Sequence, residues 1–144
     1  MIEIQPISTV VAEVDVPGSK SYTHRLLIAS ALADGRSTIE NMLVSEDTLL
    51  TLSAIEAMGA ATAAENGRRI VHGTGGRLAA VPELHLGNSG TSVRLLTAVA
   101  ALADGETVLT GTPRMQERPV ADLLDGLGQL GVSAVSLSGN GCPP

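Results

Sequence analysis

The residues best suited to chemistry lie in one short stretch, Pro17-Gly18-Ser19-Lys20-Ser21-Tyr22-Thr23-His24-Arg25. Lys20 is the only lysine of the chain, whose other basic residues are arginines. A lysine is a compact point charge with three donors and a shiftable pKa, whereas an arginine is a wide fork that stays protonated. A glycine-containing turn that leads into a helix also presents free backbone N–H groups and the positive end of the helix dipole. The stretch therefore predicts an anion site, with phosphate as the expected ligand; the alternative is an ordinary surface turn with an N-cap serine.

A second turn of this kind lies at Gly87-Asn88-Ser89-Gly90-Thr91-Ser92-Val93-Arg94 and also leads into a helical pattern. A polar loop follows at Pro113-Arg114-Met115-Gln116-Glu117-Arg118-Pro119. The chain thus holds two candidate helix starts of similar design, each with an arginine a little further along.

The elements that must position these turns follow from the spacing of apolar residues. Small and aliphatic residues at helical spacing predict helices at 21–33, 45–58, from the 87–94 turn to 104, and at 120–130. Alternating patterns predict two short strands within 1–16 and further strands at 37–43, 61–65, 69–74, 83–86, 107–110 and 132–137. Asn66-Gly67 predicts a tight hairpin turn between two of them.

Two copies of one unit fill the chain. Ala31-Leu32-Ala33-Asp34-Gly35 recurs as Ala101-Leu102-Ala103-Asp104-Gly105, and Gly18 precedes Arg25 by seven residues, as Gly87 precedes Arg94. After each Asp-Gly come a strand, a polar loop and a second helix. The predicted fold class is α/β (α+β), built from β-α-β-α-β-β units at about 17–74 and 83–144. Because the second copy lacks its final strands, we expect the chain to be a piece of something longer.

Composition narrows the classes of function. Hydrophobic residues make up 44% of the chain, aromatic residues only 1%, and the net charge is −6. Few aromatics and no basic surplus argue against a nucleic-acid partner. The single cysteine, Cys142, the lack of an N-terminal signal segment and the lack of a long apolar run predict a cytoplasmic protein with no membrane partner. No cluster of cysteines and histidines suggests a metal site.

Three segments carry a resemblance to a known family: 17–21 with Arg25, 86–91 with Arg94, and 113–119. Together they resemble the N-terminal part of 5-enolpyruvylshikimate-3-phosphate synthases, also called 3-phosphoshikimate 1-carboxyvinyltransferases. The resemblance covers nearly the whole chain but only about the first third of a family member. The nearest alternative is the sister family, the UDP-N-acetylglucosamine 1-carboxyvinyltransferases, which typically has Lys-Asn at the first turn and a cysteine in the third segment. This chain has Lys20-Ser21 and no cysteine there.

The resemblance implies transfer of the enolpyruvyl group of phosphoenolpyruvate to the 5-hydroxyl of shikimate 3-phosphate, with release of phosphate and without a cofactor. This is a step toward chorismate and the aromatic amino acids, and the family is the target of glyphosate. The implied fold has two lobes, each an inside-out α/β barrel of three β-α-β-α-β-β units. About two units would be present here, and the strands of 1–16 would belong to the other lobe.

The resemblance also implies a role for individual residues. Lys20 is implied to be catalytic and to touch both substrates, and Ser21 and Arg25 to bind shikimate 3-phosphate. The residues implied to bind phosphoenolpyruvate are Lys20, Asn88, Gly90, Thr91 and Arg118. Gly90 would leave room for the ligand, where a side chain would intrude. Arg94 has two open interpretations, a place in the site or a structural ion pair behind it.

Other polar residues receive structural interpretations. His24 is expected to be polar scaffolding rather than a base, Arg114 and Glu117 to be loop charges, and His72 and His85 to be structural. The family's acid and base groups come from later segments, so we expect no turnover from these 144 residues alone.

Two further alternatives stay open. One is a non-catalytic anion-binding lobe, which could self-associate to cover an unpaired apolar face. The other is an RNA 3′-terminal phosphate cyclase-like protein, against which the acidic balance weighs.

Overall fold

The computed structural model describes residues 2–144, and Met1, part of the first predicted strand, lies outside them. The chain has a mixed α/β fold, as the sequence predicted. In chain order its elements are α1 (Lys20–Leu32), β1 (Arg36–Ile39), α2 (Glu46–Ala57), β2 (Ala61–Glu65), β3 (Arg68–His72), β4 (Glu83–His85), α3 (Gly90–Ala100), β5 (Val108–Thr110) and α4 (Ala121–Gln129). No helix among the described residues is long and apolar enough to cross a membrane.

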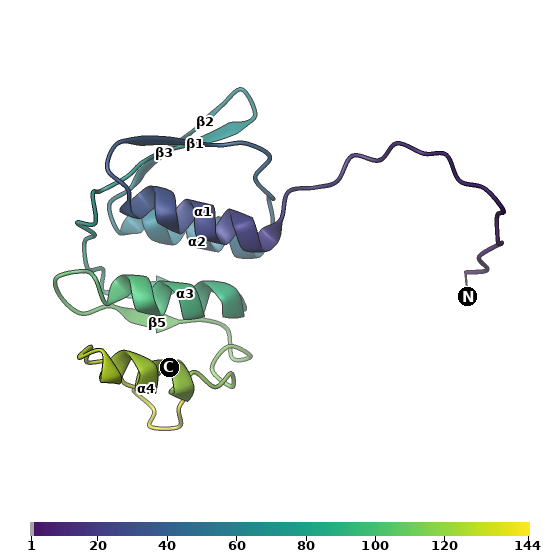
Figure 1. Cartoon of the computed structure of the whole chain (residues 1–144). Helices are drawn as coiled ribbons and strands as arrows, with labels where there is room; N and C mark the ends of the chain where they lie inside the picture. Colours follow the sequence, from purple (N-terminus) through teal and green to yellow (C-terminus); the bar gives the residue numbers. More distant parts are fainter. Residues whose placement is uncertain (1) are drawn as a thin grey trace.

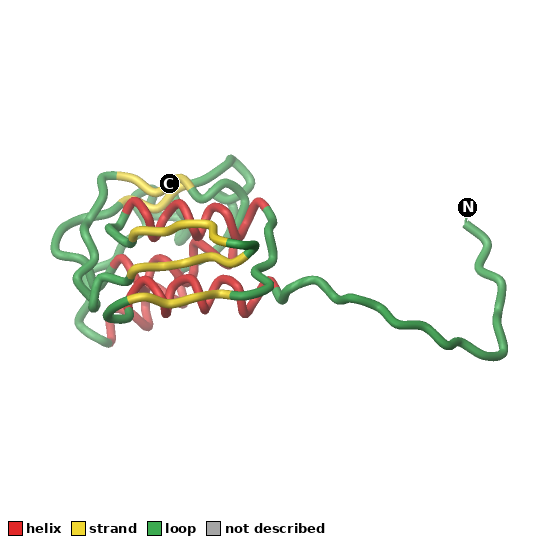
Figure 2. Tube along the Cα trace, turned by 90° about the horizontal axis from the view of Figure 1, so that it is seen from above, coloured by secondary structure: helices red, strands yellow, loops and turns green. Residues whose placement is uncertain are grey.

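The first half of the body is a three-stranded antiparallel sheet packed on two helices. The sheet has the order β1-β3-β2, so β3 lies in the middle, and it covers α1 and α2 (Figures 1 and 2). Asn66 and Gly67 both take positive φ angles, 50° and 76°, between β2 and β3. Such a pair is typical of the tight hairpin turn that the sequence predicted. Val71 of β3 is fully buried and belongs to the hydrophobic core, so it anchors the sheet to the helices.

The second half is a parallel pair of strands with α3 as the crossover. β4 pairs with β5 in the register Glu83↔Val108 and His85↔Thr110. Helix α4 then follows and ends the regular structure (Figure 1). The three helices α1, α2 and α3 share one core, whose fully buried members include Leu27, Ile55 and Leu96. This shared packing sets the start of α1 against the start of α3.

The predicted strands within 1–16 are wrong for residues 2–16, which form an extended tail with no strand pairing among the described residues. Figure 1 shows the tail leaving the body at the start of α1. Its apolar side chains are exposed, with 96% of Val11 and 87% of Ile4 accessible. Alternation of apolar and polar residues suits a segment to pair as a strand, but it does not supply the partner strand. Without a neighbouring strand, the backbone N–H and C=O groups of the segment bond to water.

The predicted strand at 132–137 is also wrong, since those residues form no strand. In the first unit the corresponding strand, β2, pairs only with β3. The described residues of the second unit contain no counterpart of β3, so residues 132–137 have no ladder to join.

The remaining differences between the predicted and the observed elements are small. The strand predicted at 37–43 ends at Ile39, because Asn41 takes a positive φ of 50° and turns the chain away.

Candidate functional site

The start of α1 is fixed by its N-cap and by a close backbone contact. Ser19 is the N-cap, and its Oγ accepts a hydrogen bond from the Tyr22 N–H at 3.4 Å. Gly18 lies so close to the loop after β1 that an added Cβ would be 1.9 Å from the carbonyl oxygen of Asn41. The same loop donates from the Leu43 N–H to Thr23 Oγ1 at 3.0 Å. The turn that the sequence singled out therefore holds Lys20 at the first position of a helix whose start packs against the loop after β1.

The start of α3 repeats this design. Ser89 is the N-cap and accepts from the Ser92 N–H at 3.3 Å. Gly87, just before it, has a φ of +53°, a conformation that side chains disfavour. At Gly90 an added Cβ would lie 2.5 Å from Arg118 Nη1 and 3.2 Å from Arg94 Nη1. Glycine at this position therefore leaves room for two guanidinium groups at the helix start.

The loop with Arg118 is tied to α3 by Arg94. Arg94 Nη2 donates to the carbonyl oxygen of Pro119 at 2.9 Å, and Nη1 donates to that of Gly90 at 3.2 Å. Arg94 thus bonds backbone carbonyls and faces the cleft described next; it makes no structural ion pair in the described residues. Arg114 pairs instead with Glu117, at 2.8 Å, on the exposed side of the loop.

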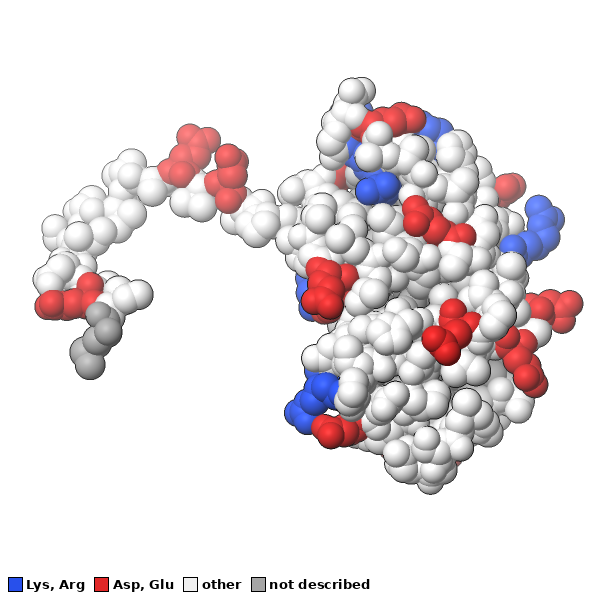
Figure 3. All heavy atoms as spheres, turned by 180° about the vertical axis from the view of Figure 1, so that it is seen from behind, with Lys and Arg blue, Asp and Glu red and all other residues white. Residues whose placement is uncertain are grey.

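The starts of α1, α2 and α3 and the loop with Arg118 line an open cleft of about 690 Å³. Its lining residues are Lys20, Arg25, Glu46, Asp47, Asn88, Gly90, Thr91, Arg94, Leu95 and Arg118. The structure thus brings together all the residues predicted for the site except Ser21. Four cationic side chains against two carboxylates make the cleft cationic within a protein whose net charge is −6. On the face of the molecule shown in Figure 3, by contrast, acidic side chains are scattered and basic ones form no broad patch.

Ser21 is the one predicted residue outside the lining. Its carbonyl oxygen accepts from Arg25 Nη1 at 3.0 Å, and the residue is exposed on α1. This bond folds the Arg25 guanidinium back along the first turn of the helix.

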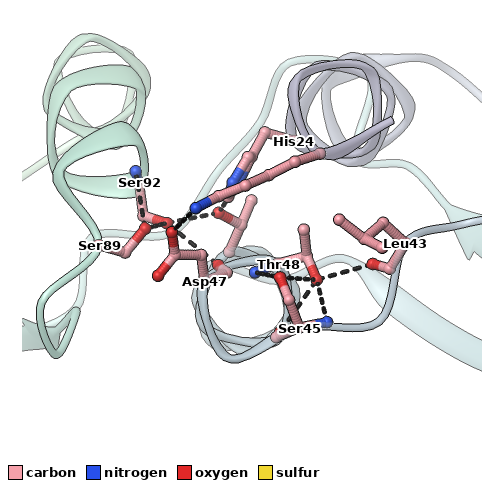
Figure 4. A network of polar contacts seen from close by, with 9 residues as sticks. His24, Leu43, Ser45, Asp47, Thr48, Ser89 and Ser92 are labelled. Atoms are coloured by element: carbon pink, nitrogen blue, oxygen red, sulfur yellow. Dashed lines mark hydrogen bonds and ion pairs between the residues drawn. The ribbon is translucent and has the colours of Figure 1, made fainter. Parts of the chain in front are cut away.

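Two acids of the cleft, Glu46 and Asp47, were missed as site residues. They begin α2, where Ser45 and Thr48 form a reciprocal capping box, drawn in Figure 4. The Asp47 carboxylate forms an ion pair with the Lys20 ammonium. Sequence spacing shows that these acids favour the start of their own helix. It does not show that α1 lies beside α2, so only the packing reveals the pair.

His24 lies beneath the cleft as neutral scaffolding. Its side chain is fully buried, and Nδ1 lies 2.8 Å from Thr51 Oγ1. Burial lowers the pKa of His24 below its ordinary value; Asp47 raises it, and the charges of Lys20 and Arg25 lower it. Among residues 2–144, no three side chains of His, Cys, Asp or Glu gather as a metal ion would require.

Comparison with known proteins relates this arrangement to one family. The model of the family EPSP synthase (3-phosphoshikimate 1-carboxyvinyltransferase) matches residues 4–144. The 3-phosphoshikimate 1-carboxyvinyltransferase of Methanobrevibacter smithii is 44% identical over 99% of this chain and 33% of its own length. The protein of the same name from Halobacterium salinarum is 51% identical over 89% of this chain and 30% of its own.

A solved structure agrees with these relatives. EPSP synthase from Acinetobacter baumannii superposes with a TM-score of 0.84 at 34% identity, over 91% of this chain and 30% of that one. The chain therefore spans about a third of the length of the proteins it matches.

Proposed function

This chain belongs to the EPSP synthase family, and from that premise we propose that its cleft is part of a site for phosphoenolpyruvate and shikimate 3-phosphate. The protein would transfer the enolpyruvyl group of the first to the 5-hydroxyl of the second, with release of phosphate. One observation supports this most: Lys20, Arg25, Arg94 and Arg118 converge from two helix starts and a loop on one open cleft. Each proposed ligand carries a phosphate and a carboxylate, which such a set of cations suits.

We divide the cleft between the two ligands by helix. Arg25 on α1, with Ser21 next to the lining, would bind shikimate 3-phosphate, while Arg118, with Asn88, Gly90 and Thr91 at the start of α3, would bind phosphoenolpyruvate. A guanidinium binds a phosphate or carboxylate through two parallel hydrogen bonds, and the helix starts add N–H donors. Lys20 would touch both ligands and stabilise the negative charge that develops in the transition state.

In the cleft, the Lys20 ammonium group forms an ion pair with the Asp47 carboxylate. A bound phosphate or carboxylate would compete with Asp47 for the ammonium group. The same contact would hold the flexible lysine side chain close to its working position. The proton transfers of the reaction need acid and base groups, which the family resemblance implies come from later segments. We expect no turnover from these 144 residues alone.

The remaining predictions belong to the same proposal. Residues 17–74 and 83–144 would be two units of one lobe, and residues 1–16 would pair with another lobe. A cytoplasmic location is proposed with them. The sister activity on UDP-N-acetylglucosamine has no observation in its favour, since the matched family is EPSP synthase. A non-catalytic anion-binding lobe stays a second candidate, because four cationic side chains line the cleft and could bind an anion without any turnover.

Calorimetric titration tests the proposal directly. The chain is titrated with shikimate 3-phosphate and then with phosphoenolpyruvate, and so are the variants Lys20→Ala and Arg118→Ala. Arg114→Ala is the matched control, because it removes a cation of the same loop that lies outside the cleft lining. We expect weak binding that is lost in Lys20→Ala, reduced in Arg118→Ala and unchanged in Arg114→Ala. A folded chain that binds neither ligand would refute the proposal for this chain.

A further inference from the structure

A chain of buried polar side chains runs beneath the cleft and joins its helices (Figure 4). His24 of α1 contacts Thr51 Oγ1 of α2. Thr51 Oγ1 lies 2.9 Å from Ser92 Oγ of α3, which lies 2.6 Å from Ser89 Oγ at the helix start. All four side chains are fully buried.

We assign one direction to the hydrogen bonds of this chain, because it gives the carbonyl oxygen of Asp47 a donor and leaves no buried N–H unpaired. Ser92 Oγ lies 3.2 Å from the carbonyl oxygen of Asp47, which can only accept, so the Ser92 hydroxyl donates there. The Thr51 hydroxyl then donates to Ser92, and its oxygen accepts from the Nδ1–H of His24. Neutral His24 has a single N–H, so Nε2 is left as a bare acceptor, and this atom is indeed buried without a partner. The reverse direction would leave a buried N–H unpaired, which is rarer and costlier.

The residues of this chain adjoin the cleft on both sides. His24 is next to Arg25 and one turn after Lys20 on α1. Ser89 caps α3 and precedes Gly90. Thr51 is the only member that contacts both sides, since it bonds His24 on α1 and Ser92 on α3.

Packing alone does not call for polar groups at this place. Leu27, Ile55 and Leu96 fill the same three-helix core with apolar side chains. Buried hydroxyls carry a desolvation cost that hydrogen bonds offset only within a narrow range of distance and angle. Apolar contacts tolerate small sliding of one helix on another, whereas this chain of bonds does not. Its effect is therefore to fix the relative position of the helices.

We propose that Thr51 is a positioning residue for the cleft. Its hydroxyl, bonded to His24 and Ser92, sets the separation between the Lys20 end of α1 and the Gly90 end of α3. The cleft thereby favours small molecules with two anionic groups that span both helix starts over single anions. Only the choice of phosphoenolpyruvate as the spanning ligand rests on the function proposed above, in which it is bound at the start of α3 and reaches Lys20 at the start of α1.

The first test needs no ligand and uses nuclear magnetic resonance of the full chain. Thr51→Val keeps the size of the side chain and removes the hydroxyl, and Thr51→Ser restores the hydroxyl. Thr97→Val is the matched control, because the Thr97 hydroxyl bonds only to Val93 of its own helix. We expect His24 to carry its proton on Nδ1 in the wild type and in Thr51→Ser. Thr51→Val should lose this preference and shift the amide signals of Lys20 and Gly90, while Thr97→Val should not.

Two results of this test would overturn the inference: a wild-type His24 protonated on Nε2, or Lys20 and Gly90 signals that Thr51→Val leaves in place. Since no ligand is involved, the result stands even where the wild type binds nothing. If Thr51→Val fails to fold, Ser92→Ala removes the next hydroxyl of the chain and is measured in its place.

The second test compares a spanning ligand with a single anion. By calorimetry, we expect Thr51→Val to weaken the binding of phosphoenolpyruvate by about five- to tenfold, the size of one lost hydrogen bond. Inorganic phosphate should change by less than about twofold, since it needs only one helix start. Thr51→Ser and Thr97→Val should bind both as the wild type does. Equal loss of both ligands, or no loss of either, would contradict the proposal. A wild type that binds neither would refute the function proposed above and leave the resonance test to decide the inference.

Discussion

At the scale of single residues, the cleft depends on how closely two cations approach a helix start. Arg118 lies where a side chain on Gly90 would stand, and Arg94 secures the loop from behind through the Pro119 carbonyl. The sequence suggested that Gly90 leaves room for a ligand. The structure adds that it leaves room for the arginine that would bind the ligand.

Gly90→Ala should therefore weaken ligand binding without harming the fold. The new Cβ would lie 2.5 Å from Arg118 Nη1, which is the end of a flexible side chain and can move aside. Alanine also suits a helix better than glycine, so the free energy of unfolding should stay the same or rise by up to about 1 kcal/mol. A displaced guanidinium loses its paired hydrogen bonds, and we expect phosphoenolpyruvate to bind about tenfold more weakly.

Calorimetry and urea unfolding together check this prediction. Gly126→Ala is the matched control, because it lies in helix α4 and its Cβ would meet nothing within 4 Å. That variant should gain stability as Gly90→Ala does but keep its affinity. Unchanged binding in Gly90→Ala would show that Arg118 does not contribute from its present position.

The buried His24 predicts a pH dependence of stability. Its pKa is lowered in the folded protein, mainly by burial, so between that value and about 6.5 the unfolded chain binds more protons than the folded one. The free energy of unfolding should thus be fully retained above about pH 6.5 and should fall as the pH drops toward the folded value. One proton limits the slope to about 1.4 kcal/mol per pH unit.

Urea unfolding of the wild type and of His24→Asn, measured from pH 5 to 8, checks this prediction (the pH range spans about one and a half units on either side of the ordinary histidine value). Asparagine can still donate to Thr51 but does not titrate in this range. His72 and His85 are exposed and remain in both proteins, so they cancel in the comparison. A slope that persists in the variant would assign the effect to other groups.

At the scale of elements, the sequence predicted what local rules decide. All four helices begin and end within a few residues of the prediction, because N-cap serines at α1, α2 and α3 and Asp-Gly or glycine stops are local signals. The Asn66-Gly67 turn was predictable for the same reason. The predicted strands at 2–16 and 132–137 were wrong, because alternating apolar residues indicate which face of a strand is apolar but not whether a partner strand exists.

The candidate site likewise contains features that the sequence could predict and features that it could not. Lys20 could be singled out because it is the only lysine and lies in a glycine-containing turn, whereas the roles expected of Gly90 and Arg118 came from the family resemblance. The Lys20–Asp47 pair and the Thr51–Ser92 bond could not be predicted, since each joins helices that are neighbours only after packing. Threonine and serine at buried positions of a helix also look like ordinary small residues. Both pairs would have become predictable only from knowing which helices contact one another.

At the scale of the whole molecule, two unpaired features face the solvent. One is the tail of residues 2–16, which Figure 2 shows as an extended chain. Its alternating apolar side chains are exposed. The other is a mostly apolar hollow of about 300 Å³, whose lining includes β5, Val120, Leu124 and residues 132–137 and 142–144. In the first unit, the equivalent place between β1 and β2 is filled by β3. The hollow therefore has the position of a missing strand.

A second copy of this chain can supply that strand, and we expect concentration-dependent dimers in which the tail of one copy enters the hollow of the other. An extended segment with alternate apolar residues suits such a place, where backbone pairing adds to apolar burial. Analytical ultracentrifugation over a range of concentrations measures the association. Deletion of residues 2–16 should abolish it, and Val11→Asp should weaken it.

Two further variants test whether the dimer contact lies between the tail and the hollow. Val44→Asp places the same charge on another exposed valine, outside both the tail and the hollow, and should leave the dimer intact. Leu124→Asp alters the lining of the hollow and should act as Val11→Asp does, provided that circular dichroism shows a folded chain. The tail and the hollow are predicted to meet only between copies. A chain without the tail still has an intact hollow, and a Leu124→Asp chain still has its tail. Mixing the two should therefore restore dimers that have one intact contact. A monomer at every concentration, or a dimer that survives loss of the tail, would show that the two features do not meet.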